Sequence, residues 1–149
     1  AACVFSCTRP PGSVWVSALV TNVNPYYRLS VLQIDLKCGA TGPVAGTYDV
    51  YMLGAGMDGT VADDAVTTGD AAGVLATQGW APKSGRLIKS WAHATNNPGN
   101  DKQIRQTLVV DDTHPYFFIL IANIGTSQPL AAAGNLVKWA PLVTRSLTS

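Results

Sequence analysis

Short segments in which apolar and polar residues alternate with a period of two recur along this sequence, and they constrain its fold more than any other feature. In residues 32–38 (LQIDLKC) every second side chain is apolar, and residues 47–52 (TYDVYM) repeat the pattern. Such a period is typical of strands that bury one face and expose the other. Residues 39–43 (GATGP) predict a turn between them. We therefore expect these two segments to form neighbouring antiparallel strands.

The same pattern predicts further strands, separated by turns rich in Asn, Asp and Pro. About seven to eight short strands predict an all-β fold, either an antiparallel β-sandwich or a jelly roll. A chain of 149 residues has the usual length of one domain. We expect a single domain over residues 1–149, with residues 1–12 as an irregular N-terminal segment. The additional predicted strands are 13–21, 87–94, 104–110, 116–124 and 136–143.

Three segments depart from simple alternation. Residues 116–124 (YFFILIANI) are apolar on both faces, which predicts a strand at the centre of the fold or beneath another subunit. Pro141 cannot donate a backbone hydrogen bond, so its strand should lie at a sheet edge there. Residues 71–77 predict one short helical turn, the only helix we expect.

Charge is scarce, which excludes several classes of partner. Asp, Glu, Lys and Arg make up 13% of the chain, about half the usual share. The formal net charge is +1, without basic runs, so we expect no nucleic acid partner. The longest apolar stretch, 116–124, is too short for a membrane-spanning helix, so we expect no membrane partner. No targeting segment is visible at the start of the sequence.

No catalytic motif accompanies the two histidines. A serine hydrolase would need His93 or His114 as its base, but His93 lies in an alternating strand and His114 in an Asp-Asp-Thr-His-Pro turn. A packing or turn role is the simpler interpretation of both. The sequence contains no nucleophile elbow, zinc-protease helix motif or phosphate-binding glycine loop. We therefore predict that the chain is not an enzyme and takes no cofactor.

The three cysteines and a cluster of aspartates are the candidates for disulfide formation and metal binding. An odd number of cysteines leaves at least one thiol outside any disulfide, which favours a reducing compartment; a bridge between Cys3 and Cys7 stays open. Neither histidine is suitably spaced to complete a zinc site with three cysteines. A Gly-rich loop could supply oxygen ligands to calcium, but its spacing matches no calcium loop and a solvated loop is simpler. Its carboxylates are Asp58, Asp63, Asp64 and Asp70.

Tryptophan distribution points to a contact surface. Trp15, Trp91 and Trp139 lie in predicted strands and are expected in the core. Trp80 lies in a polar segment, TQGWAPKSG, where it either packs locally or joins an interface. We predict a contact surface formed by this loop, the segment before Gly12 and the sheet edge at the last strand. The candidate interface residues are Arg9, Trp80, Pro82, Lys83 and Pro141.

Two stretches carry a resemblance to a known group of proteins. They are residues 46–64 (GTYDVYMLGAGMDGTVADD) and 115–142 (PYFFILIANIGTSQPLAAAGNLVKWAPL), with a looser fit at 18–36. Together they resemble small virion structural proteins of tailed bacteriophages, in which a strand ends in an acidic "DGT" loop and an aromatic-rich strand is followed by an "AASGN" turn. The matching positions are 58–60 and 131–135. The N-terminal AACVFSCTRPP and residues 96–103 depart from the pattern, and the motif defines no site residues.

The resemblance implies a β-sandwich on the phage particle, assembled in the host cytoplasm. We expect a capsid decoration (cement) protein that bridges capsid subunits, with the major capsid protein or other virion proteins as partners and the chain itself a homo-oligomer. The alternatives are a tail, neck or fibre accessory protein, or a carbohydrate- or receptor-binding β-sandwich module. A jelly-roll coat protein would be expected to carry a basic arm, which this chain lacks.

Overall fold

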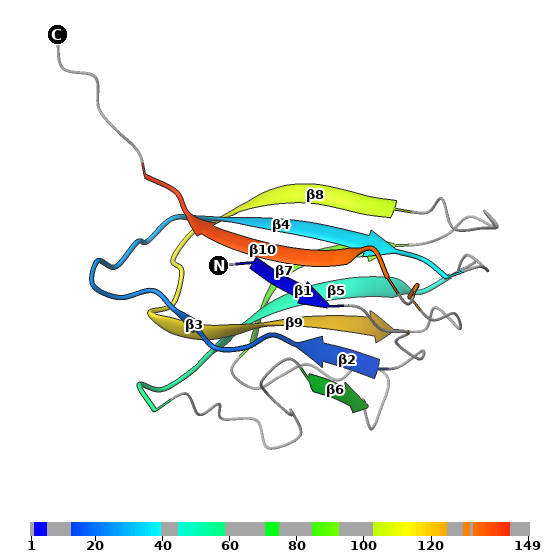
Figure 1. Cartoon of the computed structure of the whole chain (residues 1–149), viewed down its shortest axis with the longest axis horizontal. Coiled ribbons are helices and arrows are strands. Elements are labelled where there is room, and N and C mark those ends of the chain that lie inside the picture. The colour runs from blue at the N-terminus through cyan, green and yellow to red at the C-terminus, as the bar shows by residue number, and fades with distance from the viewer. Residues whose placement is uncertain are drawn as a thin grey trace, which may run out of the picture.

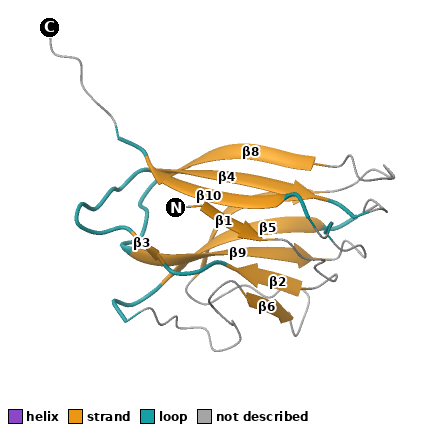
Figure 2. Cartoon of the chain, in the orientation of Figure 1, coloured by secondary structure: helices purple, strands orange, loops and turns teal. Residues whose placement is uncertain are grey.

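Every regular element in the described part of the chain is a β-strand, as the alternating pattern predicts (Figure 2). The described residues contain no helix long and apolar enough to cross a membrane. The computed structural model describes residues 2–5, 13–39, 45–58, 71–74, 85–92, 103–124, 130–131 and 133–143; for 2–5, 13, 71–74 and 103 it describes the backbone only.

Ten strands are described, two or three more than predicted, because the additional ones are short. They are β1 (Ala2–Phe5), β2 (Ser13–Val16), β3 (Val20–Thr21), β4 (Ser30–Lys37), β5 (Thr47–Gly54), β6 (Ala71–Val74), β7 (Gly85–Ala92), β8 (Gln103–Val110), β9 (Tyr116–Ile124) and β10 (Asn135–Pro141).

The strands form two antiparallel sheets that pack face to face as a β-sandwich (Figure 1). The first sheet has the order β1-β10-β4-β8. The second has the order β6-β2-β9-β5-β7, with β3 also paired to β9. Strands distant in the sequence are neighbours in both sheets, which is the usual consequence of a chain that crosses between the layers of a sandwich. The fold class predicted from the sequence is confirmed.

The core lies between the sheets and is built from the apolar members of the alternating pattern. Leu32 and Ile34 of β4 are fully buried in one cluster with Phe117 and Ile119 of β9. Burial of each such side chain contributes about 1.5–3 kcal/mol. The tryptophans of the predicted strands join this cluster as expected: Trp15 and Trp91 are buried, and Trp139 packs against it.

Strand β9 is buried on both faces, as its sequence predicts. Its odd-numbered apolar residues face the core, while Phe118, Leu120 and Ala122 form a second buried cluster on the other face with Val14 and Leu53. The strand lies in the middle of the second sheet, between β2 and β5. Side chains on both faces of the strand are therefore covered, which agrees with the apolar residues that its sequence places on both faces.

The prediction that residues 32–38 and 47–52 form neighbouring strands is wrong. β4 belongs to the first sheet, between β10 and β8, and β5 belongs to the second, between β9 and β7. A strand buries one face and exposes the other whether it pairs with the next strand in a hairpin or joins the opposite sheet. The alternating pattern therefore cannot distinguish these two arrangements. The pairing was settled by the long-range partners of the two strands.

Two predictions about short segments are also corrected. Residues 1–12 were expected to be irregular, but Ala2–Phe5 form β1, which pairs with Asn135–Lys138 of β10. Residues 71–77 were expected to form a helical turn, but Ala71–Val74 form β6 and pair with β2. Three of the four residues of β6 are Ala or Gly, which carry little intrinsic strand preference, so pairing with β2 decides their conformation.

The predicted strand over residues 13–21 is interrupted at Ser17. The Ser17 hydroxyl accepts a hydrogen bond from the Ile119 amide at 2.9 Å, and the Ser17 amide donates to the Ile119 carbonyl at 2.9 Å. The hydroxyl thus takes over a bond that a backbone carbonyl would make in a regular ladder. The pairing with β9 shifts by one residue across the break, from Val16 opposite Leu120 to Val20 opposite Phe117.

Candidate functional site

The structure describes one of the five predicted interface residues. Arg9, Trp80, Pro82 and Lys83 lie outside the described residues, so their roles remain predictions. Pro141 is the last residue of β10, is exposed, and pairs with Ser30 of β4. β1 pairs only as far along β10 as Lys138, so at Pro141 the strand has a described neighbour on one side alone. This position agrees with the expectation that Pro141, which has no amide hydrogen to donate, lies at a sheet edge.

The end of β10 that carries Pro141 lies at the same end of the sandwich as three other segments (Figure 1). The amide of Leu142 donates to the Leu29 carbonyl at 3.0 Å, and the amide of Thr113 donates to the Arg28 carbonyl at 2.9 Å. The amide of Ala55 donates to the Tyr116 carbonyl, also at 2.9 Å. These bonds gather four segments, which we call the loop end. It consists of residues 22–29, 55–58, 111–115 and 141–143.

Asn22 holds the longest of these segments in shape. Its side chain is buried; Nδ2 donates to the Tyr27 carbonyl at 2.7 Å, and Oδ1 accepts from the Tyr27 amide at 3.2 Å. Its backbone amide donates to the Pro115 carbonyl at 2.7 Å. Asn24 adopts a positive φ of 57°, which Asn tolerates better than most residues, and precedes a cis peptide bond to Pro25. The segment is therefore pinned at its base.

Tyr26 presents an aromatic ring with a fixed hydroxyl. Tyr26 Oη donates to the Thr113 carbonyl at 2.6 Å, yet 49% of the residue is exposed. The Thr113 side chain is itself buried and shares a hydrogen bond of 2.7 Å with Ser30 Oγ. An aromatic ring held at its polar tip loses little freedom on binding, a property that favours Tyr at interfaces.

Arg28 joins the 22–29 segment to the turn after β8. Its Nε lies 2.9 Å from Asp112 Oδ1 and 3.3 Å from Asp111 Oδ1. The hydrogen bond to Asp112 is the main cause of a raised pKa at Arg28, followed by the charges of both aspartates. All three side chains are well exposed, so the pairs orient the loops more than they stabilise the fold. Arg86 of β7 adds a 2.7 Å bond to the Asp111 carbonyl.

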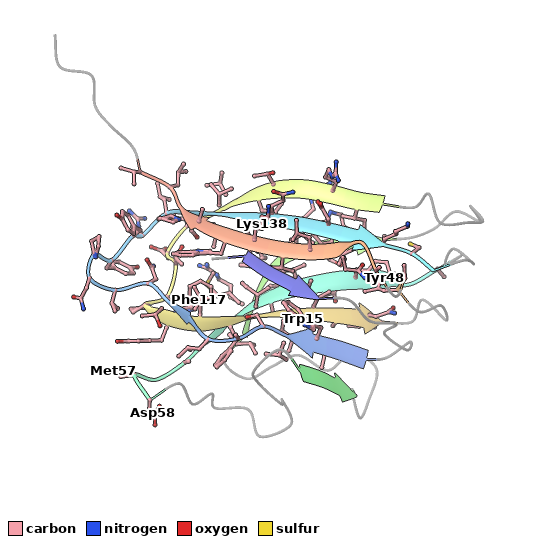
Figure 3. The ribbon with its side chains drawn as sticks, in the orientation of Figure 1. Trp15, Tyr48, Met57, Asp58, Phe117 and Lys138 are labelled. Atoms are coloured by element: carbon pink, nitrogen blue, oxygen red, sulfur yellow. The ribbon has the colours of Figure 1, made fainter. Side chains whose placement is uncertain are left out.

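An open groove separates the 22–29 segment from the residues after β5. It has a volume of about 540 Å³ and is lined by Val23 and Asn24, by Ala55–Met57, and by Pro115 and Tyr116. Met57, which is labelled in Figure 3, lies at the rim of the groove and is 85% exposed. Val143 is also largely exposed, at the neighbouring end of β10. The loop end therefore combines exposed apolar side chains with loops that are hydrogen-bonded in place.

His114 contributes packing at this end. Its ring lies against Gly54, close enough that a Cβ on Gly54 would be 3.4 Å from His114 Cε1. Burial lowers the pKa of His114, and the positive charge of Arg86 lowers it further. A lowered pKa keeps the ring neutral around pH 7. The turn or packing role predicted for this residue fits that geometry, while His93 lies outside the described residues.

The calcium and thiol hypotheses fall mainly on residues that are not described. Asp58 is exposed in the turn after Met57, whereas Asp63, Asp64 and Asp70 lie outside the described residues. Among the residues the structure covers, no three His, Cys, Asp or Glu side chains gather where they could hold a metal ion. Cys38 is a buried thiol outside any disulfide, with Sγ 4.0 Å from the Tyr48 hydroxyl. The pairing of Cys3 and Cys7 remains open.

Residues 22–29 were not part of the predicted contact surface. A sequence signal for them exists in residues 24–28 (NPYYR), where a turn dipeptide precedes two aromatic residues and a basic one. Aromatic residues beside turn residues indicate exposed rings, but only the fold shows that Asp111 and Asp112 lie opposite Arg28.

Comparison with known proteins identifies no relative. No protein-family model matches the sequence, and neither a curated protein nor a solved structure is significantly similar to it.

Proposed function

We propose that this chain is a structural protein of a tailed-bacteriophage virion that decorates the capsid and binds the major capsid protein through its loop end. The proposal rests on the resemblance of residues 46–64 and 115–142 to virion proteins of this kind, together with the all-β sandwich fold. The observation that carries it is the exposure of Met57 and Tyr26 on hydrogen-bonded loops.

The loop end is suited to protein contact for two physical reasons. Exposed apolar and aromatic side chains supply most of the binding energy in protein interfaces. Loops already held by Asn22 and by the pairs of Arg28 lose little conformational entropy when a partner binds. A groove of about 540 Å³ beside Met57 can accept an apolar side chain of the partner.

Decoration of a closed shell does not require tight individual contacts. Many copies act on one particle, so a modest free energy per contact adds up to a large effect on the assembly. The low charge of the chain is consistent with a protein that places part of its surface against neighbours.

The first test is the copy number of the chain in purified particles, measured by quantitative mass spectrometry against the major capsid protein. A copy number in proportion to the capsid lattice supports decoration. A small fixed number moves the chain to the neck, tail or fibres, and absence from the particle contradicts the proposal.

The second test separates the loop end from the rest of the surface. Met57→Asp places a charge at the rim of the groove and should lower occupancy on the particle about tenfold, as expected for loss of an interface anchor. Leu87→Asp on β7 is the matched control, because Leu87 is also exposed but lies outside the loop end. Equal loss from both variants, or from neither, would show that the loop end is not the contact.

Trp80→Ala tests the other predicted contact surface. Loss of attachment without loss of stability would place the Trp80 loop in the interface as well. Deletion of residues 1–11 would test the predicted contact segment before Gly12 less specifically, because it also removes β1 from the first sheet.

A further inference from the structure

Among the described strands, β8 is the edge of the first sheet and pairs on one side only. Its eight residues pair with β4 from Gln103 opposite Lys37 to Val110 opposite Ser30, without any shift in register. The sheet order ends at β8, and Figure 1 shows no described strand beyond it. A long regular edge presents a row of backbone groups to which another strand can bond.

The other sheet edges are less suited to strand addition. β1 and β6 have four residues each. β7 is longer, but its pairing with β5 is irregular between Val50 and Tyr51, and it carries Lys89 and Arg86. Bulges, charges and short length are the usual protection of an edge. β8 has no proline and a single charged residue, Arg105, whose Nε is paired with Asp35 Oδ2 at 3.4 Å on the neighbouring strand.

The hydrogen bonds around β4 show which backbone groups of β8 face outward. Leu29 and Lys37 both direct their carbonyls toward the β10 side, accepting from the amides of Leu142 and Ala131. Successive residues of an antiparallel strand direct their backbone groups to opposite neighbours, so the even-numbered residues of β4 face β8. Leu32 pairs with Leu108, so the even-numbered residues of β8 bond back to β4.

The odd-numbered residues of β8 therefore direct their amides and carbonyls to the open edge. These residues are Gln103, Arg105, Thr107 and Val109, and the side chains of the last three are exposed. Ile104 and Leu108 alternate with them and pack only partly buried against the core cluster. A strand added here would satisfy the free backbone groups and cover apolar surface at the same time.

We propose that two copies of this chain pair antiparallel through β8, across a two-fold axis at Thr107, joining their first sheets into one continuous sheet. In this register Thr107 lies opposite Thr107 of the second copy, and Arg105 lies opposite Val109 of the second copy. Both of these pairings match residues whose backbone groups face the open edge. Thr–Thr pairs are favourable across antiparallel strands.

The β8 edge is complementary to the β8 edge of a second copy, so a second copy of the chain is the proposed partner. No like charges face each other in this register, whereas a register centred on Arg105 would oppose two positive charges. Val109, which is 65% exposed, would be covered by the aliphatic part of the opposing Arg105. The inference goes beyond the proposed function, because the β8 edge and the loop end are different surfaces and dimers could form whatever the loop end binds.

The test is the dissociation constant of the purified full chain, measured by sedimentation equilibrium. Thr107→Lys opposes two like charges at the axis and should raise that constant at least about tenfold, the equivalent of about 1.4 kcal/mol. Gln33→Lys is the matched control, because Gln33 is the partner of Thr107 on β4 and lies away from the edge. It should leave the dimer unchanged.

A second variant tests the backbone bonds. Thr107→Pro removes an amide that faces the open edge and spares those that bond to β4, so it should give a folded monomer with the parental circular dichroism spectrum. A monomeric parent chain, or a dimer that Thr107→Lys and Thr107→Pro leave intact, overturns the proposal. The loop-end variant Met57→Asp should remain dimeric, so failure of the capsid-binding proposal and failure of this one give different results.

Discussion

The hydroxyls of Ser30 and Thr113 lie 2.7 Å apart and share a buried hydrogen bond, although 83 residues separate them in the sequence. Both side chains are fully buried. Ser30 begins β4, and Thr113 lies in the turn between β8 and β9, so this bond connects the first sheet to the loop end. The Tyr26 hydroxyl donates to the Thr113 carbonyl, so the position of the exposed Tyr26 ring depends indirectly on the buried pair of Ser30 and Thr113.

The Ser30 and Thr113 hydroxyls should be energetically coupled, because removing either one leaves the other buried without this partner. Thr113→Val leaves the Ser30 hydroxyl buried, and we expect a loss of about 1–3 kcal/mol in the free energy of unfolding. The double variant Ser30→Ala with Thr113→Val should lose less than the sum of the single variants. Urea unfolding of all four proteins in a double-mutant cycle measures the coupling. Strict additivity would show that the two hydroxyls do not act as a pair.

Asn22 should be needed for the shape of the loop end. Asn22→Ala removes both side-chain bonds to Tyr27, and we expect a loss of about 1–3 kcal/mol in stability, with faster hydrogen exchange at the Tyr27 amide. Asn22→Asp keeps the acceptor but places an oxygen against the Tyr27 carbonyl, so it should be no better than the alanine variant. Unchanged exchange at Tyr27 in both variants would contradict this assignment.

The lowered pKa of His114 should make stability depend on pH. Its pKa in the unfolded chain is near 6.5 and is lower in the folded protein. As the pH falls below about 6.5, His114 therefore becomes protonated in the unfolded chain before it does so in the folded protein. The stability that is present above this pH is lost as the pH falls toward the pKa of His114 in the folded protein.

Urea unfolding at about pH 7.5 and about pH 5.5 measures this dependence. His114→Gln should show a smaller difference between the two conditions than the parent chain does. Both proteins retain His93, so its contribution cancels in the comparison. An identical difference in the two proteins would assign the pH dependence to other groups.

Gly134 should tolerate substitution poorly. It has a φ of 91°, and a Cβ there would lie 3.0 Å from Lys37 Cδ. The lysine chain can move aside, but the backbone conformation remains strained, so Gly134→Ala should cost about 1–3 kcal/mol. Gly54→Ala is the matched control, because its Cβ would meet His114 at an ordinary contact distance. Thermal unfolding compares them, and equal melting temperatures would argue against strain at Gly134.

Part of the fold was readable from the sequence because strand patterning is local. Alternation in residues 32–38 and the double apolar face of residues 116–124 correctly predicted a half-buried strand and a central one. Ser17 interrupts a strand whose sequence looks continuous, since its hydroxyl finds the Ile119 amide only in the folded chain. The position of Pro141 at a sheet edge could be predicted because proline has no amide hydrogen to donate to a neighbouring strand.

Alternation along the sequence was enough to predict an all-β fold, either a β-sandwich or a jelly roll, because side-chain direction along a strand follows from the position of each residue. The assignment of β4 and β5 to different sheets came from the three-dimensional structure, because pairing depends on which distant strands bury their faces together. The composition of the loop end likewise depends on the three-dimensional structure. Tyr26, Met57 and Thr113 come from separate segments, and only the packing of the two sheets places them at one end of the molecule.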